Sequence, residues 1–129
     1  MGTLQQLSFL LMILSNTLAV QEARAQEVWI VPQVYIMAVV TAYTNSPDEG
    51  WGDGQITASG QKVRNGFLAC PRQYRFGTAF KIKDKTYFCQ DWMNKRYEDK
   101  ELEHFDILMM NDKQGALEWG RQVLEIEKL

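Results

Sequence analysis

Two aspartates stand at positions where a carboxylate is unusual. Asp91 lies two residues after a cysteine, and Asp106 lies inside the run FDILMM (105–110), which is otherwise typical of a buried strand. Aspartate is depleted in strands and is rarely buried without a partner. Partial burial and a nearby carboxylate each raise the pKa of a carboxyl group, and a carboxyl that keeps its proton near neutral pH can act as a general acid. The sequence therefore predicts a site for acid–base chemistry.

The composition excludes several other kinds of site. The chain has 129 residues and a formal net charge of −2, so it carries no basic footprint for nucleic acid. Its only histidine is His104, and its only cysteines are Cys70 and Cys89. These residues are too few for the usual Cys/His zinc sites. We therefore expect no metal, no cofactor and no nucleic-acid partner, and the apolar content of 46% indicates one domain with a real core.

The first 25 residues differ in kind from the rest. The stretch 7–20 (LSFLLMILSNTLAV) is apolar, and the motif ARA (23–25) has the small-x-small pattern that signal peptidase cleaves. The apolar core is shorter than the ~20 residues of a membrane-spanning helix. We predict that residues 1–25 are a secretory signal peptide, so that the mature protein begins at Gln26, leaves the membrane and is secreted or periplasmic. The alternative is an uncleaved N-terminal anchor.

Export makes the cysteines informative. An even number of cysteines in an oxidising compartment predicts one disulfide, Cys70–Cys89. Closing a loop of about 20 residues stabilises a fold by roughly 3 kcal/mol in the chain-entropy model. The alternative is a pair of free, buried thiols.

The rest of the chain predicts short strands separated by turns. β-branched, aromatic and alternating runs bounded by Gly, Asp, Asn and Pro are typical of strands, and here they cover 34–43, 56–60, 66–70, 76–83, 86–91, 105–110 and 121–129. The segment 44–55 is rich in Gly and Asp and predicts a loop. One short helix is expected over 112–119, capped by Asn111 or Asp112 and ended by Gly120. The pattern indicates an all-β barrel or sandwich with one short helix near the C-terminus.

The order of these segments resembles the 3D domain, which is named for three aspartates. The resemblance rests on VTAYT (40–44), ITASG (56–60), PRQYRFGT (71–78), CQD (89–91), FDI (105–107) and a helix followed by GR (120–121). The 3D domain is a double-psi β-barrel, related to the catalytic domain of the membrane-bound lytic transglycosylase A family, to rare lipoprotein A and to expansins. The resemblance implies a small double-psi barrel of six or seven strands over 38–129, preceded by a lead-in over 26–37.

Two of the three aspartates of that family have counterparts here. Asp91 matches the one at the end of the central strand, and Asp106 matches the one in the following strand, which is taken as the catalytic acid/base in lytic members. The third has no counterpart, because Cys70 precedes Pro71 where many members have an aspartate. The link 92–105 (WMNKRYEDKELEHF) is highly charged and free of glycine, where many members have a short glycine-rich loop.

The resemblance implies a lytic transglycosylase, a lyase that cleaves the glycan strand of peptidoglycan to a 1,6-anhydro-muramic acid product. One carboxyl suffices, because the C6 hydroxyl of the muramic acid attacks C1 of its own ring. The same carboxyl protonates the leaving oxygen and later takes the proton of that hydroxyl. We expect Asp106 to be this acid/base, and Asp91 to raise its pKa and orient the sugar. As alternatives, Asp106 is a strand-end residue bonded to backbone N–H groups and Asp91 is a turn cap.

Other functions and other residues stay open at this point. The chain is alternatively a non-catalytic, expansin-like module that binds cell-wall polysaccharide, or an envelope interaction domain in which the barrel is only a scaffold. Thr57 and Ser59 can hydrogen-bond substrate or form a turn. Trp92, beside the first aspartate, and Trp51 can stack on sugar rings or pack in the core. His104 lies an even number of residues before the expected acid, and therefore on the same strand face.

Overall fold

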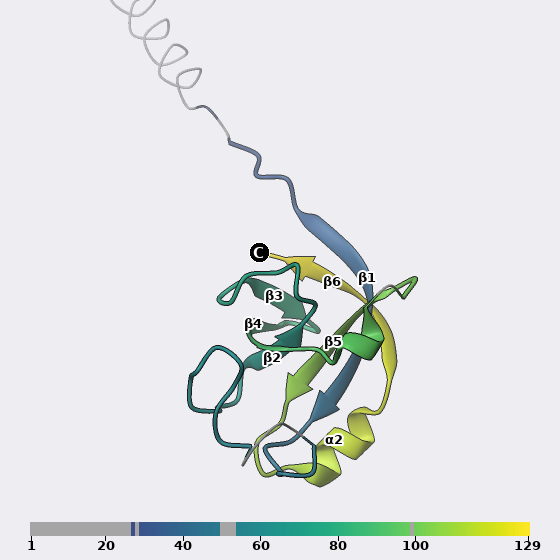
Figure 1. Cartoon of the computed structure of the whole chain (residues 1–129). Helices are drawn as coiled ribbons and strands as arrows, with labels where there is room; N and C mark the ends of the chain where they lie inside the picture. The colour runs from purple at the N-terminus through teal and green to yellow at the C-terminus, as the bar shows by residue number, and fades with distance from the viewer. Residues whose placement is uncertain (1–26, 28, 50–53, 99) are drawn as a thin grey trace, which may run out of the picture. The chain divides into compact units, whose positions relative to one another are not determined.

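The computed structural model describes residues 27, 29–49, 54–98 and 100–129 (Figure 1). The predicted signal peptide and Trp51 lie outside the described residues. The chain divides into two units, 1–32 and 33–129, and the second unit holds the strands described below. None of the helices in the described part of the chain has the length and apolar content needed to cross a membrane.

Six strands close into a barrel. They are β1 (Val34–Tyr43), β2 (Phe67–Cys70), β3 (Ala79–Ile82), β4 (Lys85–Trp92), β5 (Glu103–Leu108) and β6 (Gln122–Lys128). The order around the barrel is β1-β5-β2-β4-β3-β6, with β1 parallel to β5 and β2 parallel to β4. The expected all-β barrel with one short helix near the C-terminus is confirmed.

The strand expected over 56–60 is absent, and this prediction is wrong. The segment is a turn closed by a single bridge between Ile56 and Lys62. Inside it, the Thr57 N–H donates to the Gln61 carbonyl at 2.8 Å and the Gly60 N–H donates to the Thr57 carbonyl at 2.9 Å. Its one large apolar side chain, Ile56, is 55% exposed, so this run has no hydrophobic face to hold it in a sheet.

Alternate strand residues fill the interior of the barrel. In β5, for example, Phe105 and Ile107 are buried and belong to the core, whereas His104 and Asp106, which alternate with them along the strand, do not. The core side chains come from all six strands: Ala38, Val40, Leu68, Cys70, Phe80, Ile82, Cys89, Phe105, Ile107 and Ile126. Tyr74 packs edge-on against Phe80, with ring centroids 5.0 Å apart.

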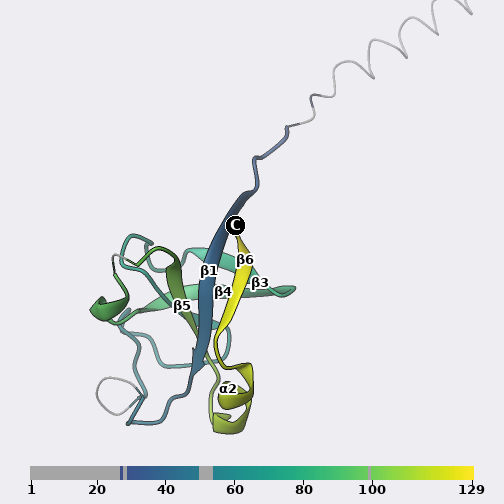
Figure 2. The ribbon, with the colours of Figure 1, turned by 90° about the vertical axis from the view of Figure 1, so that its right-hand side faces the viewer.

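The short helix α2 (Lys113–Trp119) lies at the end of the barrel where β1 and β5 finish (Figures 1 and 2). The Asp112 side chain caps it by accepting the Gly115 N–H at 2.8 Å, so the cap is Asp112 rather than Asn111. Gly120 ends it at φ 63°, a left-handed conformation that glycine adopts at little cost. Trp119 donates its indole N–H to the Val40 carbonyl at 3.1 Å, which joins the helix to β1.

The expected disulfide is present. Cys70 and Cys89 are bonded with their Cα atoms 5.7 Å apart, and both are fully buried. The bond joins β2 to β4 inside the barrel and leaves no free cysteine among the described residues.

Candidate acid–base site

Asp106 and Asp91 are brought onto one face by the register of four strands. Asp106 is paired with Thr41 on one side and with Ala69 on the other, and Ala69 is in turn paired with Asp91. Register partners point to the same side of a sheet. Because the neighbours of Asp106 in β5 enter the core, this row of side chains lies on the face that points away from the core.

A β-bulge decides the direction of Asp91. Leu68 is paired with Cys89, but the next residue, Ala69, is paired with Asp91, so Gln90 is an extra residue in β4. Without it, Asp91 would lie on the same face as Cys89, inside the barrel. The carbonyl of Gln90 is not left unpaired, because it accepts the N–H of Ser59 at 3.1 Å. The bulge therefore turns the Asp91 side chain to the outer face of the sheet, and bulges near active sites often redirect a side chain in this way.

The Asp106 carboxyl group has an environment suited to a general acid. The side chain is half-buried, and burial is the main cause that raises its pKa to about 7. The Thr41 hydroxyl donates to Oδ1 at 3.0 Å and opposes this shift. Among the described residues no group donates to Oδ2. Near neutral pH a substantial fraction of Asp106 therefore carries a proton.

The main charged neighbour of Asp106 is Glu49, which the sequence patterns do not reveal. Two negative charges raise the pKa of Asp106, and the effect of Glu49 is larger than the effect of Asp91. The Glu49 carboxylate accepts the Thr44 N–H at 2.9 Å and also the Thr44 hydroxyl. Glu49 lies in a Gly- and Asp-rich loop without periodicity, so nothing in the sequence places it near Asp106.

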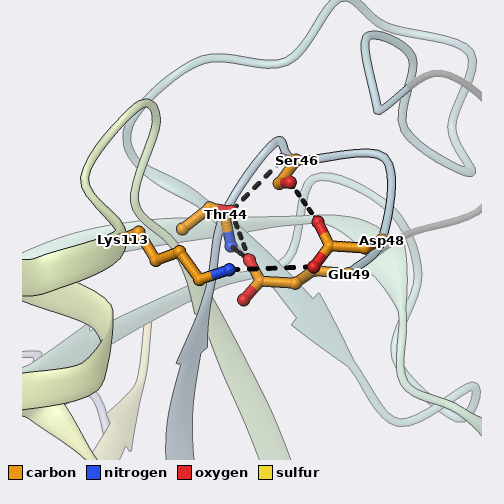
Figure 3. A network of polar contacts seen from close by, with 5 residues as sticks. All are labelled: Thr44, Ser46, Asp48, Glu49 and Lys113. Carbon is orange, nitrogen blue, oxygen red and sulfur yellow. Dashed lines mark hydrogen bonds and ion pairs between the residues drawn. The ribbon is translucent and has the colours of Figure 1, made fainter.

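Figure 3 shows how the segment after β1 holds Glu49. The Ser46 N–H donates to the Thr44 hydroxyl at 3.2 Å, and the Ser46 hydroxyl donates to the Asp48 carboxylate. Lys113, in the first turn of α2, forms an ion pair with Asp48 at 3.7 Å. The segment is thereby connected to α2 as well as to β1.

Asp91 acts as an acceptor for three donors. The Tyr43 hydroxyl donates to Oδ2 at 3.0 Å, while the N–H groups of Ala58 and Trp92 donate to Oδ1 at 3.1 and 3.0 Å. Burial, followed by the charge of Asp91, raises the pKa of the Tyr43 phenol. Both carboxylate oxygens are therefore engaged. Asp91 ties β1 and the 56–62 turn to β4, which is close to the turn-cap alternative.

Thr57 and Ser59 are occupied by their own turn. Thr57 is buried, its hydroxyl lies 2.9 Å from the Ser59 hydroxyl, and it also donates to the Gln61 carbonyl at 3.2 Å. The backbone of the same turn supplies the N–H groups that hold Asp91 and the bulge. The arrangement supports the turn-forming alternative for these two residues.

Trp92 lies on the other face of the sheet from Asp91. It is paired with Cys70, whose side chain enters the core, and not with Ala69. Its ring packs against Phe76 with centroids 4.1 Å apart, and the Arg72 guanidinium lies 5.7 Å from its centroid. Phe76 is 37% exposed, so the aromatic pair forms a surface of its own, separate from the two aspartates.

His104 lies on the acid's face of β5, as expected, and borders a cavity. The cavity has a volume of about 260 Å³ and does not include Asp106 in its lining. The His104 ring stacks on Tyr97 with centroids 4.8 Å apart. Burial, with smaller contributions from Arg121 and Lys100, lowers the pKa of His104.

In the part of the chain that the structure describes, no three His, Cys, Asp or Glu side chains are grouped so as to hold a metal ion.

The sequence matches no protein-family model, and it matches no curated protein.

Proposed function

We propose that this protein is a peptidoglycan lytic transglycosylase of the cell envelope, with Asp106 as its acid/base. The observation that carries the proposal is the state of one side chain: a half-buried carboxyl on a barrel strand, with a pKa of about 7 and one oxygen held by the Thr41 hydroxyl. An ordinary aspartate is almost fully ionised at neutral pH and has no proton to give.

The reaction balances with a single carboxyl. Asp106 gives its proton to the glycosidic oxygen as the C1–O bond of the muramic acid breaks. The C6 hydroxyl of the same sugar then bonds to C1, and the carboxylate takes the hydroxyl proton. Asp106 ends protonated as it began, the product is a 1,6-anhydro sugar, and no water is consumed. The tethered nucleophile removes the need for the second catalytic carboxylate that ordinary glycosidases use.

Thr41 and Asp91, whose side chains lie on the same face of the sheet as Asp106, act as positioning groups. The Thr41 hydroxyl holds Oδ1 by a hydrogen bond of 3.0 Å. Asp91 fixes the turn and the Tyr43 side chain beside the acid rather than reacting. The proposal also draws on the resemblance to the 3D domain, which implies a small β-barrel, and the six strands here close into a barrel with the two aspartates on either side of β2.

A wall-binding module without lytic activity is the second candidate. The Phe76–Trp92 pair, in which Phe76 is exposed, favours it, because an aromatic surface can stack on sugar rings without any chemistry. It lies on the other face of the sheet from Asp106, so binding there does not require the acid.

One experiment separates these functions. Protein purified after export is incubated with purified sacculi, and the soluble products are identified by mass. We expect anhydro-muropeptides from the parent and a loss of about 10²–10⁴-fold in their release from Asp106→Asn. Asp84→Asn is the matched control, because Asp84 is an exposed turn residue at φ 66°, a conformation that asparagine accepts.

The other outcomes identify the alternatives. Protein that pellets with sacculi but releases nothing is a binding module. Protein that neither pellets nor releases product would support the interaction-scaffold alternative. An Asp106→Asn protein that melts normally and releases product at the parental rate would remove Asp106 from the mechanism.

A further inference from the structure

The cavity beside His104 is built by the charged link that replaces the family's glycine-rich loop. Its walls come from three places: the connection after β2, the link with its 3-10 helix η1 (Lys95–Tyr97), and the start of β5. The lining residues are Pro71, Arg72, Gln73, Met93, Tyr97, Glu98, Lys100, Leu102, Glu103 and His104. The link 92–105 therefore supplies most of the residues that line this cavity.

The charged side chains that the structure describes in the cavity lining are of both signs. Arg72 is paired with Glu98 at 3.5 Å, and Glu103 accepts the Tyr74 hydroxyl at 2.8 Å and the Gln73 amide. Among the described lining residues, two cationic and two anionic side chains, with an amide between them, offer both donors and acceptors. This lining suits a neutral ligand with several hydroxyl or amide groups better than it suits a phosphate or a polycation.

The remaining walls are aromatic and apolar. Tyr97 stacks on His104 at a ring angle of 30°, and Met93 is almost fully buried, at 7% exposed. Pro71 and Leu102 add further apolar surface. A pyranose ring presents an apolar C–H face to such side chains, and an N-acetyl group adds a methyl. The volume of about 260 Å³ is below the ~300–1,000 Å³ of sites for drug-sized ligands, and so matches one ring.

The position of the cavity connects it to the acid. His104 and Asp106 lie on the same face of β5, two residues apart. Two strand residues span roughly 6.6 Å, about the length of one sugar unit. A ring held against His104 would therefore be followed by a glycosidic bond in the neighbourhood of Asp106.

We propose that this cavity is a subsite for one N-acetylhexosamine ring of the glycan strand. The proposal rests on the proposed lytic function for its role in catalysis, but its binding step is measurable without any lysis. The stack of Tyr97 on His104, with the Arg96 guanidinium 4.8 Å from the Tyr97 centroid, supplies the aromatic wall. The donors and acceptors of Arg72, Gln73 and Glu98 bind the ring hydroxyl and amide groups.

Binding is tested with soluble tri-N-acetylchitotriose and with N-acetylglucosamine alone. We expect NMR shift changes at the side chains of Tyr97 and His104 in the parent. Tyr97→Ala should bind the trisaccharide about tenfold more weakly. Tyr35→Ala is the matched control, because Tyr35 is an exposed tyrosine of β1 outside the cavity, and it should bind like the parent. If Tyr97→Ala does not fold, the NMR shift changes of the parent still test the site.

Kinetics on sacculi separate the subsite from the lytic function. Tyr97→Ala should raise KM about tenfold and leave kcat within about twofold of the parent. Asp106→Asn should bind the trisaccharide normally and release no product. NMR shift changes at His104 without any lysis would support the subsite and overturn the lytic function.

Two results would overturn the subsite itself. One is lysis by Tyr97→Ala with a parental KM, which would leave the lytic function intact. The other is the lack of any NMR shift change at Tyr97 and His104 up to about 10 mM trisaccharide, well above a weak Kd of about 1 mM.

Discussion

Asp106 and Asp91 are both register partners of Ala69, so the two carboxylates stand on either side of β2 on the same face of the barrel. Two strand spacings put their Cα atoms roughly 10 Å apart. Charges at that separation interact weakly near a solvated surface. This agrees with the finding that burial, and not Asp91, is the main cause of the raised pKa of Asp106.

Replacing Asp106 should stabilise the protein at alkaline pH. The folded state holds the Asp106 proton up to a pKa of about 7, against 3.8 in the unfolded chain, so the free energy of unfolding falls as pH rises through that window. Asp106→Asn does not titrate and should melt higher than the parent at pH 8. Each unit by which the pKa differs between the folded and unfolded states changes the free energy of unfolding by about 1.4 kcal/mol. A change of 1 kcal/mol in that free energy moves Tm by about 4–8 °C.

The same difference in Tm should shrink toward zero below about pH 3, where the aspartic acid is protonated in both states. Thermal melts at the two pH values, with Asp84→Asn as control, measure it. An Asp106→Asn protein that is less stable than the parent at pH 8 would contradict the burial of a carboxylate at this position.

Removing the Thr41 hydroxyl should raise the pKa of Asp106 further, because its hydrogen bond to Oδ1 favours the ionised form. For a general acid, the alkaline limb of the pH–rate profile on sacculi should then move to higher pH in Thr41→Val. Thr41→Ser keeps a hydroxyl and should resemble the parent. NMR titration of the Asp106 carboxyl measures its pKa directly, and a lower pKa in Thr41→Val would be inconsistent with this contact.

Removing the charge of Glu49 should lower the pKa of Asp106, since Glu49 is the first of the charges that raise it. Glu49→Gln keeps an oxygen to accept from the Thr44 backbone, so the loop should stay in place. The decrease should exceed the one caused by Asp91→Asn. Asp48→Asn serves as a control in the same loop, and NMR titration of Asp106 in all three variants decides the order. Equal pKa values in Glu49→Gln and the parent would show that Glu49 does not act on the acid.

Asp91→Asn should lower the free energy of unfolding clearly and change the pKa of Asp106 only slightly. Asparagine has one accepting oxygen for the three donors that Asp91 holds, and hydrogen bonds to charged groups contribute about 1.5–3 kcal/mol. Tyr43→Phe removes one of these bonds. In a double-mutant cycle by denaturant unfolding, the two changes should couple by about 0.5–3 kcal/mol. Additive effects would mean that the Tyr43–Asp91 contact contributes nothing.

Loss of the disulfide should destabilise the barrel. The bond joins β2 to β4 across the bulge that aims Asp91, and a closed loop of this size contributes roughly 3 kcal/mol. A Cys70→Ala/Cys89→Ala double variant should show this loss in denaturant unfolding. Thiol titration of exported parent protein should find no free cysteine, and two titratable thiols would refute the bond.

The local patterns of the sequence predicted much of the fold. The run 34–43 is a strand with the predicted bounds, because its alternate side chains meet the core. The helix and its end at Gly120 follow from capping chemistry, which acts within a few residues. The strand predicted over 56–60 does not form. The composition of this run is typical of a strand, but its one large apolar side chain, Ile56, stays in solvent.

The candidate site was only partly predictable. The sequence by itself identified Asp106 as a carboxylate in a strand, and it limited the disulfide to Cys70 and Cys89. The tertiary structure decided that Asp91 faces outward, through the extra residue Gln90, and that Glu49 affects the pKa of Asp106 more than Asp91 does. The reason is physical: strand periodicity is local, whereas register, bulges and loop positions depend on contacts between segments far apart in the chain, and a register shift of one residue reverses the face of every side chain that follows.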